Sequence, residues 1–147
     1  MELSPDLNEL LRLFHSHGVE SVVVGAHALA HHGAPRFTGD LDLFVAPTRE
    51  NATKILGSLE AFGFGGLGLN VDDFSTPDQV IQLGTPPSRV DILTSLSGVS
   101  WETARATAVH TQFGDIPVLV LGRDELIANK RATGRLKDQA DLEAIGE

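Results

Sequence analysis

The chain contains no cysteine, which excludes disulfide bonds and thiolate metal sites. It also lacks any run approaching the roughly 18 consecutive apolar residues that a membrane-spanning helix needs, so we expect no membrane association. Its first residues are acidic, whereas a secretory signal begins with basic residues and continues with apolar ones. Together these absences predict a cytoplasmic protein.

Basic residues are scarce. The chain has 11 Lys and Arg against 20 Asp and Glu, which gives a formal net charge of −9. An acidic surface repels phosphate backbones at long range, so we expect no extended binding of DNA or RNA. Small anions can still bind where cations gather locally. A dense local group does exist, and it consists of Lys130, Arg131, Arg135 and Lys137.

The length and the composition are those of one globular domain. At 147 residues, 41% of them hydrophobic and 21% charged, the chain can bury a core of ordinary size. The sequence has no internal repeat, linker or low-complexity segment, and we therefore predict a single domain over residues 1–147. Helical and strand patterns alternate along it. This predicts an α/β (α+β) fold in which helices flank one sheet.

Periodicity, capping residues and turn residues predict the individual elements. Helices are expected from Pro5 to just before Gly18, over 26–32, across 52–59 after a Thr48 cap, near 101–107, and from about 124 to 145 with an interruption near Gly134. Strands are expected over 21–24, 40–45, 80–83, 89–93, 109–113 and 116–121, and a turn-rich loop over 63–70. Gly114 and Asp115 suit a type II′ hairpin, which makes the sheet mixed.

Two acidic residues, Asp40 and Asp42, open the strand over 40–45. Residues two apart in a strand point to the same face, with backbones about 6.5–7 Å apart. Two carboxylates so placed repel each other unless a cation lies between them, and Mg²⁺ or Mn²⁺ prefers such oxygen ligands. Asp91 lies in the apolar strand over 89–93, where an unpaired buried acid would be costly. Beside the first strand it would complete a three-carboxylate cluster. Alternatively, the acid pair lies on a solvated sheet face.

The residues upstream favour the cluster. Val22 to Val24 form a strand that runs through Gly25 into the start of a helix. A helix start offers free backbone N–H groups and a dipole that favours phosphate.

The order Gly25-Ala26, Asp40-Leu41-Asp42 and Asp91 resembles the DNA polymerase beta superfamily of nucleotidyltransferases. That superfamily has Gly-Gly or Gly-Ser, then two acids separated by one residue, then a third acid. The segments 24–29, 32–43, 87–93 and 129–142 are similar to a bacterial branch of small single-domain nucleotidyltransferase-like proteins, related to toxin-type nucleotidyltransferases. The resemblance covers nearly the whole chain and implies the nucleotidyltransferase fold.

The resemblance also implies an activity. A nucleoside monophosphate would pass from a nucleoside triphosphate to an acceptor, which could be RNA, protein or a small molecule, with loss of pyrophosphate. Asp40 and Asp42 would hold two Mg²⁺ or Mn²⁺ ions, and Asp91 would bind the second ion and take a proton from the acceptor hydroxyl. Two ions about 3.5–4 Å apart can stabilise both the attacking and the leaving oxygen.

One position departs from the pattern. Many active members have serine after the glycine, whose hydroxyl helps to bind the triphosphate, and here that residue is Ala26. The backbone N–H groups at Gly25 and Ala26 remain. A second hypothesis is therefore a catalytically weak nucleotide-binding or partner-binding module with the same fold.

Other residues are candidates for nucleotide binding. Arg36 and Thr38 precede the acid pair and could contact phosphate or orient the metal loop, although Arg36 could equally pair with one of the acids. Lys130 and Lys137 are seven residues apart, and they would share a helix face if the helix continued through Gly134. We predict that these two lysines face phosphate. The alternative is that the basic group is only a solvated helix face.

Overall fold

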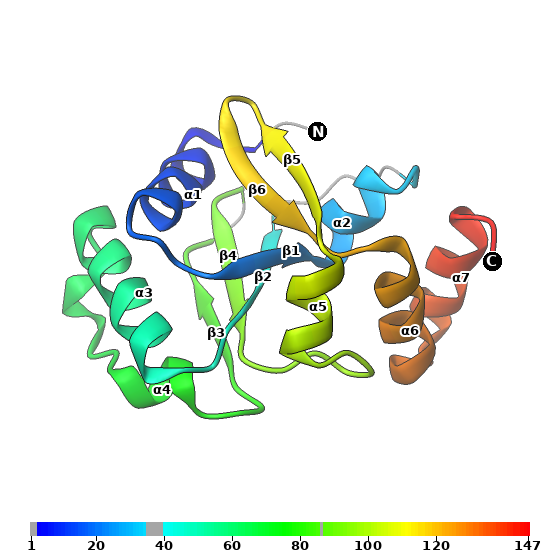
Figure 1. Ribbon diagram of the computed structural model, residues 1–147. Coiled ribbons are helices and arrows are strands. Elements are labelled where there is room, and N and C mark those ends of the chain that lie inside the picture. The colour runs from blue at the N-terminus through cyan, green and yellow to red at the C-terminus, as the bar shows by residue number, and fades with distance from the viewer. Residues whose placement is uncertain (1–2, 35–39, 86) are drawn as a thin grey trace.

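A computed structural model describes the chain over residues 3–34, 40–85 and 87–147 (Figure 1). The elements in chain order are α1 (Pro5–Ser16), β1 (Ser21–Val24), α2 (Gly25–His31), β2 (Asp40–Val45), α3 (Arg49–Phe62), the 3₁₀ helix η1 (Gly65–Leu67), α4 (Val71–Ser75), β3 (Val80–Leu83), β4 (Arg89–Leu93), α5 (Trp101–Thr107), β5 (Val109–Phe113), β6 (Ile116–Val120), α6 (Arg123–Thr133) and α7 (Leu136–Ala144). All six predicted strands are present.

The strands form one mixed sheet in the order β3-β4-β2-β1-β6-β5. β2 is parallel to β4 and antiparallel to β1, and β1 is in turn parallel to β6. The β3–β4 and β5–β6 pairs are antiparallel. At the β5–β6 turn Gly114 has a φ of 63°, as a type II′ hairpin requires. The predicted α+β class, a mixed sheet flanked by helices, is confirmed.

Helices cover both faces of the sheet. Figure 1 shows α1, α3 and α4 on the left of the strands and α5, α6 and α7 on the right. Successive strand residues point to opposite faces, so Phe44 of β2 shares the face of Asp42. The Phe44 ring meets Trp101 of α5 edge-on at 5.3 Å between ring centroids. The acidic face of β2 is therefore the face that α5 covers.

Local sequence signals account for the first and third helices. Ser4 accepts a hydrogen bond from the Leu7 N–H, and Pro5 occupies the first helical position of α1. Thr48 caps α3 in the same way, as predicted. One face of α1 is buried, and it consists of Leu7, Leu10, Leu11 and Phe14. No helix in the described ranges is both long enough and apolar enough to cross a bilayer.

Two segments differ in detail from the sequence prediction. The predicted loop over 63–70 contains the short helix η1, and the unpredicted helix α4 follows it. Asn70 and Asp73 form a reciprocal capping box that starts α4, and Phe74 buries its ring in the core. The predicted interruption near Gly134 is present, because this glycine ends α6 with a φ of 61°.

Candidate functional site

The parallel pairing of β2 with β4 brings the acidic residues together. Asp42 pairs with Asp91 and Asp40 pairs with Arg89, so all four side chains belong to one face of the sheet. Asp40, Asp42 and Asp91 line a single cavity of about 560 Å³. The sequence predicted this convergence from the strand pattern and from the apolar context of Asp91.

Four parts of the chain build the walls of this cavity. Strands β2 and β4 supply the carboxylates, and the junction of β1 with α2 supplies Gly25 and Ala26. The segment after β4 contributes Ser95 and Ser97. The fourth wall comes from α6 and α7 with their connection, through Asn129, Lys130, Thr133, Arg135 and Lys137. Three members of the predicted basic group, all except Arg131, therefore line the same space as the predicted carboxylates.

Gly25 lies directly against the Asp42 carboxylate. It has a φ of 68°, in the left-handed region that favours glycine, and a Cβ added here would overlap Asp42 Oδ2. Both the backbone conformation and the close approach therefore require glycine. Ala26 follows at the start of α2, and Val24, the residue before the helix, provides no side-chain cap.

Arg89 is a site residue that the sequence reasoning missed. Its Nε donates to Asp91 Oδ1 at 3.0 Å and its Nη2 donates to Asp91 Oδ2 at 3.1 Å. The same Nε lies 3.9 Å from Asp40 Oδ1. Arg89 precedes Asp91 by two residues in β4, so the strand period places both on one face. The strand period is the signal by which Arg89 could have been identified from the sequence.

Asp42 lies in an environment that disfavours its charged form. Burial, followed by the charges of Asp91 and Asp40, raises the pKa of the Asp42 carboxyl to about 6. Lys137 acts in the opposite direction and lowers this pKa. Asp42 thus titrates near neutrality, and an added cation would favour its ionised form.

The donor chemistry of the cavity fits a hard divalent cation. Three carboxylates face one space, and burial together with the charges of Asp91 and Asp40 raises the pKa of Asp42, an effect that a bound cation would offset. Within the described part of the chain, no three or more His, Asp or Glu side chains already stand in a metal-binding arrangement. Arg89 engages both oxygens of Asp91, so a metal ion would have to share Asp91 with this guanidinium or displace it.

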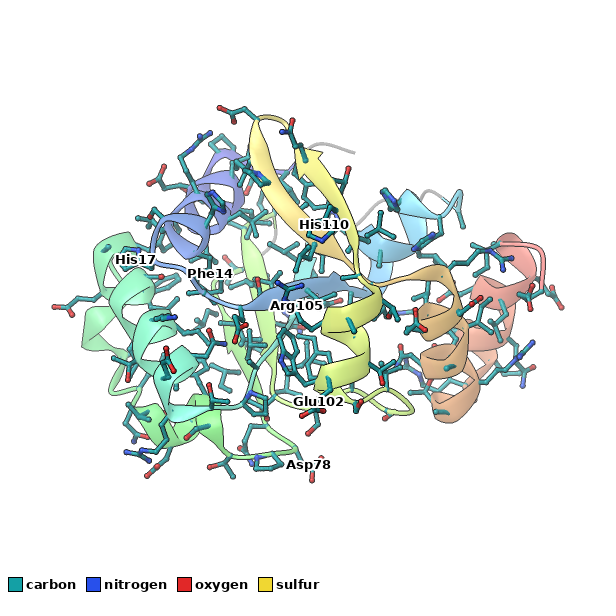
Figure 2. All side chains as sticks on the ribbon, viewed as in Figure 1. Phe14, His17, Asp78, Glu102, Arg105 and His110 are labelled. Carbon is teal, nitrogen blue, oxygen red and sulfur yellow. The ribbon has the colours of Figure 1, made fainter. Side chains whose placement is uncertain are left out.

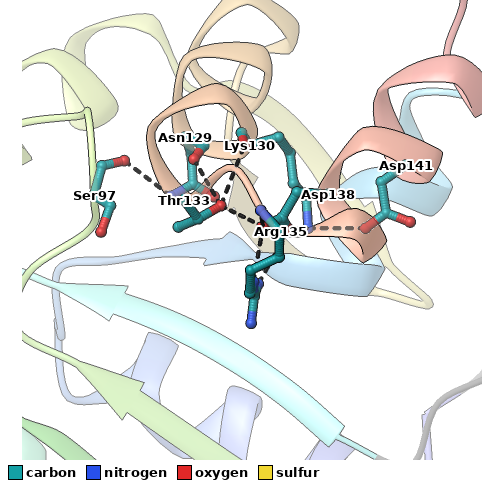
Figure 3. A network of polar contacts seen from close by, with 7 residues as sticks. All are labelled: Ser97, Asn129, Lys130, Thr133, Arg135, Asp138 and Asp141. Atoms are coloured by element: carbon teal, nitrogen blue, oxygen red, sulfur yellow. Dashed lines mark hydrogen bonds and ion pairs between the residues drawn. The ribbon is translucent and has the colours of Figure 1, made fainter.

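Lys130 is held inside a buried network that joins α6 to α7 (Figure 3). Its side chain is only 7% exposed, and its Nζ lies 3.4 Å from Asp138 Oδ1 and 3.0 Å from Asp141 Oδ2. Arg135 donates to both oxygens of Asp138, at 2.8 and 3.1 Å. Thr133 donates to Asp138 Oδ2 at 2.6 Å. The Arg135 hydrogen bond is the main cause that holds the pKa of Asp138 well below its usual range.

The other predicted nucleotide-binding residues occupy different positions. Lys137 is exposed on α7 and lines the cavity, and because the helix is broken at Gly134 it does not share a helical face with Lys130. Arg131 pairs with Glu147 at 3.3 Å. Arg36 and Thr38 lie outside the described residues.

Comparison with known proteins bears on the fold. No protein-family model and no curated protein matches the sequence. The structure is similar to the crystal structure of a putative nucleotidyltransferase from Thermotoga maritima, with a TM-score of 0.61. The two chains are 14% identical, and the match covers 93% of this chain and 88% of that one. At this identity the similarity concerns the fold alone, which is nucleotidyltransferase-like.

Proposed function

We propose that the chain is a metal-dependent nucleotidyltransferase that binds a nucleoside triphosphate in the 560 Å³ cavity. The observation that carries the proposal is the convergence of Asp40, Asp42 and Asp91 opposite Lys137 in this one space. Carboxylates and a nearby unpaired cation are the groups needed to hold divalent ions and a polyphosphate side by side.

The acids have separate roles in this proposal. Asp40 and Asp42 hold Mg²⁺ or Mn²⁺, and Asp91 binds the second ion and accepts a proton from the acceptor hydroxyl. When bound, the ions offset the charge that builds up on the attacking and leaving oxygens. Arg89 fixes the Asp91 side chain through two hydrogen bonds and offsets part of the carboxylate charge.

The triphosphate would bind at the side of the cavity that α7 lines. Lys137 has no carboxylate partner within ion-pair distance among the described residues, so its ammonium is available for a phosphate oxygen. The Arg135 side chain is 61% exposed and also lines the cavity. The backbone at Gly25 and Ala26 borders the cavity beside Asp42, and Arg36 and Thr38 complete the proposed phosphate contacts. Lys130 supports this wall through its pairs with Asp138 and Asp141.

A catalytically weak nucleotide-binding or partner-binding module is the second candidate, and two observations favour it. Asp91, which should share the second ion, gives both of its oxygens to Arg89. Ala26 borders the cavity where many active relatives in the resembled superfamily place a serine hydroxyl.

The acceptor is RNA, protein or a small molecule; RNA and protein are the acceptors of the toxin-type nucleotidyltransferases to which the resembled branch is related. The test is incubation with each α-labelled nucleoside triphosphate, Mg²⁺ or Mn²⁺, and cell RNA or protein, followed by detection of transferred label. Asp42→Asn should abolish transfer. Asp115→Asn is the matched control, because Asp115 is exposed and paired with Arg12 at the β5–β6 turn. Triphosphate binding without transfer by the parent protein would favour the weak module, and Ala26→Ser would then be the informative repair.

A further inference from the structure

A second cavity of about 510 Å³ lies beside β1 and β6, two neighbouring strands that are only partly paired. β1 and β6 are parallel neighbours, but their pairing is limited to Val23 with Val120. The earlier parts of the two strands diverge, and Ser21 of β1 and Val118 of β6 border the space between them. The last turns of α1 and α5 and the outer strand β5 complete its walls. Its volume lies within the range of about 300–1,000 Å³ typical of small-molecule sites.

The walls of this cavity have an apolar floor and a polar rim. Apolar side chains come from three elements and include Leu11, Phe14, Val23 and Val118. Nitrogen-bearing side chains at the rim come from α1, α5 and β5, and they are His15, Arg105, His110 and Gln112. Figure 2 labels Phe14, Arg105 and His110 on these elements. An apolar floor with a few polar groups at its edge is the usual composition of a ligand pocket.

Arg105 differs from the other arginines of the described chain. Arg12, Arg49, Arg89, Arg123, Arg131 and Arg135 each pair with a carboxylate within 4.0 Å. Arg105 has no such pair among the described residues, although the protein has a net charge of −9 and Glu20 lines the same cavity. An unpaired guanidinium above an apolar floor is a place for an external anion.

We propose that this cavity binds a small organic anion with a compact apolar body, whose carboxylate, sulfonate or phosphate group pairs with Arg105. The apolar body lies against Phe14 and Val118, where its burial supplies most of the binding energy. The anionic group points away from Glu20, the one acidic residue that lines the cavity within the described chain. This site shares no lining residue with the 560 Å³ cavity, so the proposal does not depend on nucleotide binding.

The probe for the test is 8-anilinonaphthalene-1-sulfonate, which combines an aromatic body with one sulfonate. Titration followed by fluorescence gives its dissociation constant, and amide chemical shifts locate it. Arg105→Gln should weaken binding about fivefold, the scale of an exposed ion pair. Arg12→Gln removes the same charge at an ion pair whose residues do not line the cavity, and it is the matched control. Glu20→Gln should tighten binding, and Val118→Phe should abolish saturable binding by filling the cavity.

Saturable one-to-one binding that perturbs β1 and β6 amides and weakens in Arg105→Gln but not in Arg12→Gln supports the proposal. Equal affinities of Arg105→Gln and the parent would overturn it, and would indicate that Arg105 serves only the end of its own helix. Shifts confined to residues around Asp42 and Lys137, or the absence of saturable binding by the parent, would overturn it as well. Arg105 is exposed, so its variant should fold even if Val118→Phe does not.

Discussion

Asp42 of β2 and Asp91 of β4 lie opposite each other in a parallel strand pair, on the same face of the sheet. Their proximity, added to the burial of Asp42, raises the pKa of the Asp42 carboxyl to about 6. Parallel strands normally bring apolar residues together at such a position, because their sheets are covered on both faces. Two facing acids therefore cost folding free energy, and that cost makes a function at this position the better explanation.

Asp42→Asn should stabilise the fold at neutral pH. A carboxyl whose pKa is raised on folding binds its proton more tightly in the folded state, so it lowers stability as the pH rises from about 4 through 6. Removal of this charge should raise the free energy of unfolding by about 1–3 kcal/mol at pH 8, and by less at pH 5. Urea denaturation at both pH values measures the difference.

The control for this measurement is Asp115→Asn. Asp115 is exposed, and the Arg12 guanidinium lowers its pKa, so loss of its charge should not stabilise the protein at pH 8. The same stabilisation from both substitutions would reflect only the reduced net charge, and the explanation based on Asp42 would then be wrong.

Arg89→Gln should raise the pKa of Asp42 further. The guanidinium bonds both Asp91 oxygens and lies 3.9 Å from Asp40 Oδ1. Its loss removes part of the positive charge that offsets the repulsion between the acids. Carboxyl carbon chemical shifts followed through a pH titration measure the change. An unaltered titration of Asp42 would show that Arg89 does not tune the cluster.

Much of this acidic arrangement could be predicted, because strand periodicity is local. Asp40 and Asp42 are two apart in one strand, and Asp91 stands out in an apolar strand. The same period could have identified Arg89. The partners of Lys130 could not be found in this way, since they depend on how α6 and α7 pack after the break at Gly134. The second cavity depends on the divergence of β1 from β6, which no local pattern encodes.

Lys130→Met should destabilise the protein by about 3–5 kcal/mol, the scale for removing one partner from a buried ion pair. Asp138 and Asp141 are both almost fully buried, and Lys130 is the cation that they share. Arg131→Met is the matched control, because its pair with Glu147 is exposed and should contribute about 0–1 kcal/mol. Urea denaturation at neutral pH compares the two. Equal midpoints would mean that the Lys130 network adds no stability.

Lys137→Gln should weaken triphosphate binding about fivefold while leaving the stability of the fold unchanged. The sequence predicted a phosphate-facing role for Lys130 first and for Lys137 second, but the ammonium of Lys130 is shared by two carboxylates. Lys137 lines the cavity and acts on the pKa of Asp42, so its field reaches the proposed metal and phosphate site. An exposed cation contributes up to about 1 kcal/mol, equivalent to the fivefold change, and added salt should reduce this contribution.

Calorimetric titration with a nucleoside triphosphate and Mg²⁺ at two salt concentrations measures both effects. Arg131→Gln changes the net charge equally, but its side chain pairs with Glu147 and does not line the cavity. If Lys137→Gln and Arg131→Gln bind the triphosphate with equal affinity, Lys137 acts only through the net charge, and the proposed phosphate contact is wrong.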